Sequence, residues 1–178
     1  MKRGAWIVLV GGAVAGLAAG ALLWGQAATA PPPITAFPPW YPAEDTHGDP
    51  PFVDYEAHIP CAIDPAPDPD CQRVKFGLVL YRDPATGEPT SYAMSILRVG
   101  VSDEREYHEG AWHVASGTAL DPDATAYRLD GVPEHLRHYW AVGDDILLIL
   151  DGDGMPRVGE AGYSYTLDSI PIRTGDSR

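Results

Sequence analysis

The sequence predicts an all-β domain, an antiparallel meander either closed as a barrel or folded as a sandwich. Three observations support this prediction. Short segments with alternating apolar residues recur every ten to twenty residues after position 52, and turn-forming Gly, Pro and Asp residues separate them. No long segment with a helical period of 3.6 intervenes.

Eight segments have the composition of strands. Most alternate apolar and polar residues, whereas 146–150 is continuously apolar, which favours a buried strand. The expected strands are 52–59, 74–81, 91–98, 109–115, 125–129, 138–142, 146–150 and 162–167. Residues 133–137 are expected to form one helical turn. We interpret Asp151-Gly152-Asp153-Gly154 as a turn, since an EF-hand calcium loop also requires flanking helices and a Glu at loop position twelve.

Residues 1–30 have the layout of an export signal or a membrane anchor. Lys2 and Arg3 precede the uncharged stretch 5–24, which as a hydrophobic helix is long enough to cross a bilayer. Small residues at 27–30 would also permit cleavage. We therefore expect a periplasmic protein, held in the inner membrane through residues 5–24 or secreted after signal cleavage.

A Pro-rich linker is expected over residues 31–51, because eight of these 21 residues are proline. Phe37, Trp40 and Tyr41 interrupt it. They either dock on the following domain or lie near the membrane surface, where aromatic side chains are favoured.

The chain is acidic, with 25 Asp and Glu against 12 Lys and Arg. Without Lys2 and Arg3, the exported part carries a net charge of −15. This charge argues against nucleic acid as a partner and against charge-driven binding to anionic lipid. Acidic residues at 103, 104, 106 and 109 are interpreted as a solvated turn.

Cys61 and Cys71 are the only cysteines, and in an oxidising compartment we expect them to form a disulfide. With His58 they are also candidate ligands for a soft metal such as Cu(I). The intervening residues favour the disulfide, because they consist largely of Pro and Asp.

No catalytic constellation is evident, and the sequence predicts a protein that is not an enzyme. It has no Gly-x-Ser-x-Gly elbow, and neither cysteine is matched with a catalytic base. His135 and His138 are three positions apart, but no neighbouring residue completes a known ligand spacing. We interpret them as surface residues.

Several short motifs occur in the same order as in the N-terminal domain family of the copper-resistance lipoprotein NlpE, which the chain resembles over roughly residues 52–168. The motifs are Tyr55, Ile59-Pro60-Cys61, Cys71, Leu78-Val79-Leu80, Glu109-Gly110-Ala111-Trp112, Tyr139 to Gly143, and Ile146 to Gly154. In that family the two cysteines form Cys-x-x-Cys, whereas here they are ten positions apart. The cysteine that anchors the family's lipid is also missing.

The resemblance implies a small lipocalin-like β-barrel over residues 52–170, followed by a C-terminal tail at 171–178. It also implies a role in copper homeostasis or envelope-stress sensing, with copper or an envelope protein as partner. The alternatives are a lipocalin-like carrier of a small apolar ligand and a structural interaction domain on a membrane tether.

Overall fold

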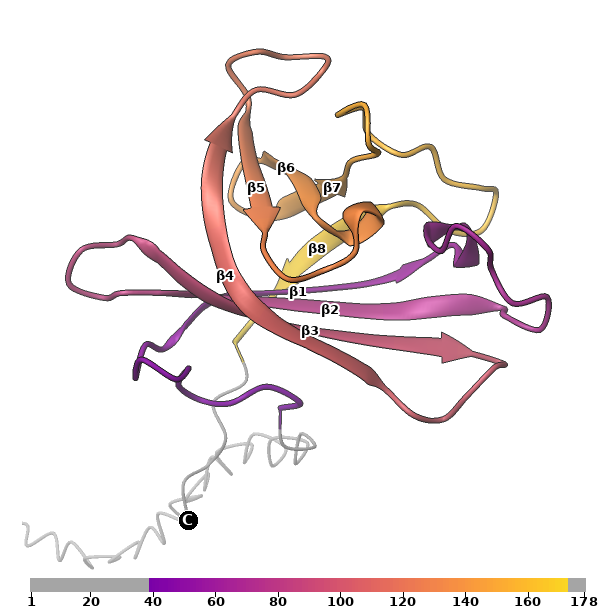
Figure 1. Cartoon of the computed structure of the whole chain (residues 1–178), viewed down its shortest axis with the longest axis horizontal. Coiled ribbons are helices and arrows are strands. Elements are labelled where there is room, and N and C mark those ends of the chain that lie inside the picture. Colours follow the sequence, from indigo (N-terminus) through magenta and orange to yellow (C-terminus); the bar gives the residue numbers. More distant parts are fainter. Residues whose placement is uncertain (1–38, 173–178) are drawn as a thin grey trace, which may run out of the picture. The chain divides into compact units, whose positions relative to one another are not determined.

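The chain folds as a closed antiparallel barrel of eight strands in sequence order, with β8 paired back to β1 (Figure 1). The structure is a computed structural model, and it describes residues 39–172. The strands are β1 (Pro51–Ile59), β2 (Arg73–Arg82), β3 (Pro89–Val99), β4 (Glu106–Ser116), β5 (Thr125–Leu129), β6 (His138–Val142), β7 (Ile146–Ile149) and β8 (Thr166–Ile170). Two short 3₁₀ turns, η1 (Cys61–Ile63) and η2 (Glu134–Leu136), complete it.

The all-β prediction is confirmed. Of the two predicted arrangements, a closed barrel and a sandwich, the structure shows the closed barrel. The predicted N-terminal hydrophobic helix lies outside the described residues. Within residues 39–172, no helix is long and apolar enough to cross a membrane.

Two predicted strands differ from the structure by three residues or more at one end or both, and the others agree within two residues. The last strand was expected at 162–167, but residues 159–163 form a turn in which the Glu160 amide donates to the Tyr163 carbonyl at 2.9 Å, so β8 begins only at Thr166. The fourth strand begins earlier than expected, because Glu106 already pairs with Ile96 of β3. Two residues of the predicted solvated turn, Glu106 and Glu109, therefore belong to β4.

Large side chains fill the barrel interior. Trp112 of β4 is fully buried, and its ring meets Tyr127 edge-on at a centroid distance of 5.0 Å. The Trp112 indole N–H donates to the Tyr81 carbonyl at 2.8 Å, and the Arg82 guanidinium lies 5.1 Å from the ring. Tyr55, Tyr92 and Tyr139 occupy much of the remaining space.

Residues 39–50 pack against the outside of the barrel, beside β2 and β3 (Figure 1). Tyr41 is buried against Val79, Tyr81 and Ala93, and the Tyr81 hydroxyl donates to the Pro42 carbonyl at 2.9 Å. Of the two placements left open for the aromatic residues, the structure shows docking on the domain for Trp40 and Tyr41. Phe37 lies outside the described residues.

The loop after β1 is tied to the barrel by the Cys61–Cys71 disulfide and by an ion pair. The Asp64 carboxylate accepts two hydrogen bonds from Arg98 of β3, at 2.6 and 2.9 Å. Arg98 also donates to Glu106 at 2.6 Å. Both Asp64 and Arg98 are largely shielded from water, with side-chain exposures of 15% and 27%.

We expect Asp64→Asn to lower the free energy of unfolding by about 1–2 kcal/mol, because it removes a partly buried, charge-assisted contact to Arg98. Urea denaturation measures the loss. The matched control is Glu134→Gln, which breaks the more exposed pair with Arg137 and should cost less than about 0.5 kcal/mol. Equal losses in the two variants would contradict the assignment.

Candidate functional site

The structure joins Cys61 to Cys71 in a disulfide, which confirms that prediction. In this form neither sulfur is a thiolate available to a soft metal. His58, the third candidate ligand, is exposed on the outward side of β1.

His135 and His138, which the sequence analysis interprets as surface residues, each lie near a different carboxylate. His135 Nε2 lies 3.7 Å from Asp64 Oδ1, and His138 Nε2 lies 3.3 Å from Glu134 Oε1. The structure therefore does not bring these two histidines together as a metal site.

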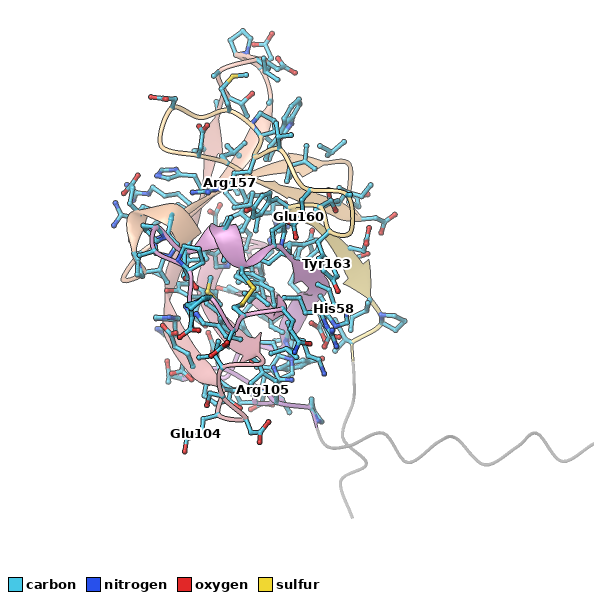
Figure 2. The ribbon with its side chains drawn as sticks, turned by 90° about the vertical axis from the view of Figure 1, so that its right-hand side faces the viewer. His58, Glu104, Arg105, Arg157, Glu160 and Tyr163 are labelled. Atoms are coloured by element: carbon cyan, nitrogen blue, oxygen red, sulfur yellow. A yellow bond between two sulfur atoms is a disulfide. The ribbon has the colours of Figure 1, made fainter. Side chains whose placement is uncertain are left out.

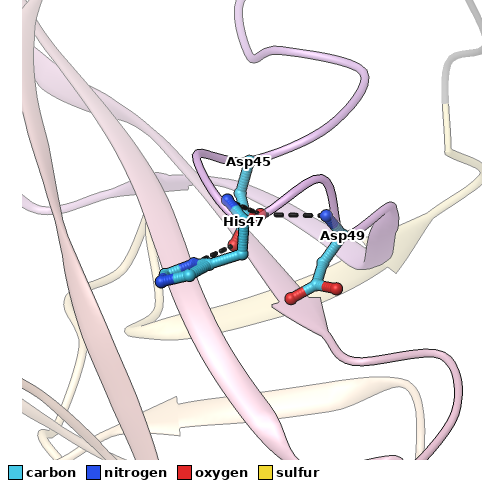
Figure 3. Close-up of side chains that lie close together, drawn as sticks. All are labelled: Asp45, His47 and Asp49. Carbon is cyan, nitrogen blue, oxygen red and sulfur yellow. Dashed lines mark hydrogen bonds and ion pairs between the residues drawn. The ribbon is translucent and has the colours of Figure 1, made fainter.

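Three potential metal ligands converge instead in the docked segment before β1. One ligand atom each from Asp45, His47 and Asp49 lies within 4.8 Å of the others (Figure 3). We refer to them as the Asp45–His47–Asp49 cluster. The three residues alternate along a tight turn that closes at Gly48, whose φ of +84° favours glycine.

Asp45 organises this turn. Its Oδ1 accepts hydrogen bonds from the backbone amides of His47 at 2.8 Å and Asp49 at 3.0 Å. Its Oδ2 accepts one from Ser91 Oγ of β3 at 2.5 Å and lies 3.3 Å from His47 Nδ1. The carboxylate thus fixes the turn, attaches it to the barrel and orients the imidazole, as carboxylate partners of metal-binding histidines do.

The surroundings of Asp45 stabilise the negatively charged form of its carboxylate. Burial alone would raise the pKa of Asp45, but the hydrogen bonds from Ser91, Asp49 and His47 outweigh it and hold this pKa far below the usual value of 3.8. Asp49 is only 9% exposed, and within residues 39–172 its carboxylate accepts no hydrogen bond. The Asp45 and Asp49 carboxylates lie close together, and their negative charges attract a cation.

We expect Asp45 to make the domain sensitive to acid. Because its pKa is lower in the folded than in the unfolded chain, the unfolded state binds the proton first, and the stabilisation is complete above about pH 5 and lost below it. Asp45→Asn removes the titrating group. Urea denaturation between about pH 6 and pH 3 is expected to show a smaller loss of stability in the variant than in the wild type. Parallel pH profiles would contradict this role.

An open groove of about 510 Å³ adjoins the cluster on the outer face of β3 and β4. Its lining includes Asp45 and His47 from the cluster and Ala93, Glu109 and Ala111 from the two strands. The cluster is therefore accessible from solvent, with the His47 side chain 65% exposed.

The sequence interpretation missed this cluster because residues 31–51 were treated as a spacer. The available signal was the spacing Asp45-x-His47-x-Asp49, in which a histidine lies between two carboxylates. That spacing becomes informative only once the segment is known to be held on the barrel.

Comparison of the chain with protein-family models, with curated proteins and with solved structures finds no match. The fold and the site thus define a class: a closed eight-stranded barrel with a cluster of potential metal ligands on its outside.

Proposed function

We propose that this chain is a non-catalytic protein of the bacterial envelope that binds a divalent transition metal at the Asp45–His47–Asp49 cluster. Its role would be in copper homeostasis or envelope-stress sensing, as in the NlpE family that its sequence resembles. The observation that carries the proposal is the convergence of the three ligand atoms within 4.8 Å.

The ligand types favour copper(II) over copper(I). An imidazole nitrogen and carboxylate oxygens suit the divalent late first-row metals, among which copper(II) binds most tightly. Copper(I) prefers sulfur, and the disulfide engages both cysteines. The copper proposal therefore moves from Cys61, Cys71 and His58 to the docked segment.

The disulfide and the predicted export segment support the envelope location. Disulfides persist in oxidising compartments such as the periplasm. The Cys61–Cys71 bond is compatible with such a compartment.

The packed interior argues against the carrier alternative. Lipocalin-like carriers hold their ligand inside an eight-stranded barrel. Here Trp112, Tyr55, Tyr92 and Tyr139 lie in that space and are each at most 1% exposed. Because the interior is filled by these side chains, we propose that ligands bind on the outer face of the barrel.

Calorimetric titration of the full chain with copper(II), zinc(II) and calcium tests the proposal. We expect copper(II) to bind most tightly and calcium most weakly. His47→Gln is expected to weaken copper(II) binding by at least about tenfold, since even the loss of an outer-shell partner typically costs that much.

The matched control is His58→Gln, which removes an exposed imidazole outside the cluster and is expected to leave the affinity unchanged. The Cys61→Ser/Cys71→Ser double variant is also expected to bind as the wild type does. Copper(II) binding that His47→Gln leaves intact would refute the assignment.

A further inference from the structure

Besides the groove beside the Asp45–His47–Asp49 cluster, a depression lies on the outer face of β1 and β2. Its lining holds more basic than acidic side chains, whereas the cluster holds two carboxylates. Its volume is about 280 Å³, and the side chains that matter for its chemistry are Trp40, Glu56, His58, Lys75 and Arg105. We call it the Trp40 hollow. His58 and Arg105 lie on the same side of the molecule (Figure 2).

Strand pairing explains why these residues meet. In the register of β1 with β2, Glu56 is opposite Gly77 and His58 is opposite Lys75. Successive residues of a strand point to opposite faces, so these four positions share the outer face. Arg105 reaches them from the turn before β4, where its guanidinium donates to Ser95 Oγ of β3 at 2.8 Å.

Gly77 allows the Trp40 indole to form one wall. A Cβ at position 77 would lie 2.7 Å from Trp40 Cζ2, so a larger residue would displace the ring. Tyr41 meets the indole edge-on at 5.3 Å, and Tyr107 lies 6.5 Å away at a tilt of 34°. The aromatic wall is therefore held in position before any ligand arrives.

The hollow brings Lys75 and Arg105 to one place on a chain of net charge −13. Arg98, Arg128 and Arg137 each form an ion pair with an acidic residue. Lys75 and Arg105, like Arg73, Arg82 and Arg157, form no ion pair within the described part of the chain.

The Arg105 guanidinium has further N–H donors beyond the one that reaches Ser95. Glu56 also lines the hollow, but the two cations outnumber it. Two cations that line the same hollow can both donate charge-assisted hydrogen bonds to an external anion.

We propose that the Trp40 hollow binds a small anion carried on a ring. Its carboxylate or phosphate group would pair with Lys75 and Arg105, because both groups accept charge-assisted hydrogen bonds. The ring would lie against the indole of Trp40. The volume of about 280 Å³ is at the small end for ligand pockets, which suits a single ring.

The test is calorimetric titration of the full chain, freed of metal by a chelator, with glucuronate, glucose 6-phosphate and glucose. These probes share a ring and differ in the anionic group. We expect one or both anions to bind and to shift the indole N–H resonance of Trp40, and glucose to do neither. The tighter anion identifies carboxylate or phosphate as the preferred group.

Lys75→Gln and Arg105→Gln are each expected to weaken anion binding by about tenfold, as loss of one charge-assisted contact predicts. The Lys75 side chain makes no hydrogen bond within residues 39–172, so its variant tests binding without removing a hydrogen bond of the fold. The matched control is Arg128→Gln, which removes the same charge from β5, where Arg128 lies 3.3 Å from Asp130, and is expected to bind as the wild type does.

Three results would overturn the proposal: neither anion binds at millimolar concentration, glucose binds as well as the anions, or Lys75→Gln binds with the wild-type affinity. None of the lining residues belongs to the Asp45–His47–Asp49 cluster, and the titration is done without metal. The outcome is therefore independent of the metal proposal.

Discussion

Trp112→Ala is expected to lower the free energy of unfolding by about 3–5 kcal/mol, the range for removal of a buried aromatic side chain. The Trp112 ring is fully buried, packs edge-on against Tyr127 and lies beneath the Arg82 guanidinium. Truncation leaves a cavity and removes the donor to the Tyr81 carbonyl. Since domains of this size are stable by about 5–15 kcal/mol, urea denaturation should show a large shift of the midpoint.

Trp140→Ala is the matched control, because it removes the same volume from a partly exposed position on β6. We expect a clearly smaller loss there. Trp112→Phe keeps an aromatic ring but lacks the indole N–H, and should cost about 1–2 kcal/mol through the unpaired Tyr81 carbonyl. Similar losses at positions 112 and 140 would show that Trp112 is not a central part of the core.

Removal of the disulfide is the second large effect. The Cys61→Ser/Cys71→Ser variant is expected to lose about 2–3 kcal/mol, because the bond closes a short loop and restricts the unfolded chain. The cysteines are ten positions apart and partly buried against the core. Urea denaturation of the oxidised wild type and the double variant measures the difference.

The reduced wild type provides the control and should unfold at nearly the same urea concentration as the double variant. Copper(II) affinity should be the same in the oxidised wild type and the double variant, because the Asp45–His47–Asp49 cluster contains no sulfur. A double variant as stable as the oxidised wild type would contradict the stabilising role of the bond.

Local patterns in the sequence predicted most of the strands. Residues 125–129 and 138–142 were placed at the bounds of β5 and β6, because turn residues flank both segments. The closure of the barrel was not predictable in this way. It depends on pairing of Asp54 with Ile170, and such long-range register is not encoded in any single window of the sequence.

The candidate site was less accessible from the sequence, for a related reason. Proline content indicated an extended spacer over 31–51, and that pattern does not show whether the spacer is docked. Docking depends on burial of Tyr41 against Val79 and Tyr81, which are about forty positions further along the chain. The disulfide was predictable, because the chain has two cysteines, which allow only one intramolecular pairing.

The most direct test of the metal proposal is the electron paramagnetic resonance spectrum of the full chain with equimolar copper(II). We predict a spectrum with nitrogen coupling from one imidazole, which disappears in His47→Gln and persists in His58→Gln. A spectrum that His47→Gln leaves unchanged would contradict the proposal that copper binds at the Asp45–His47–Asp49 cluster.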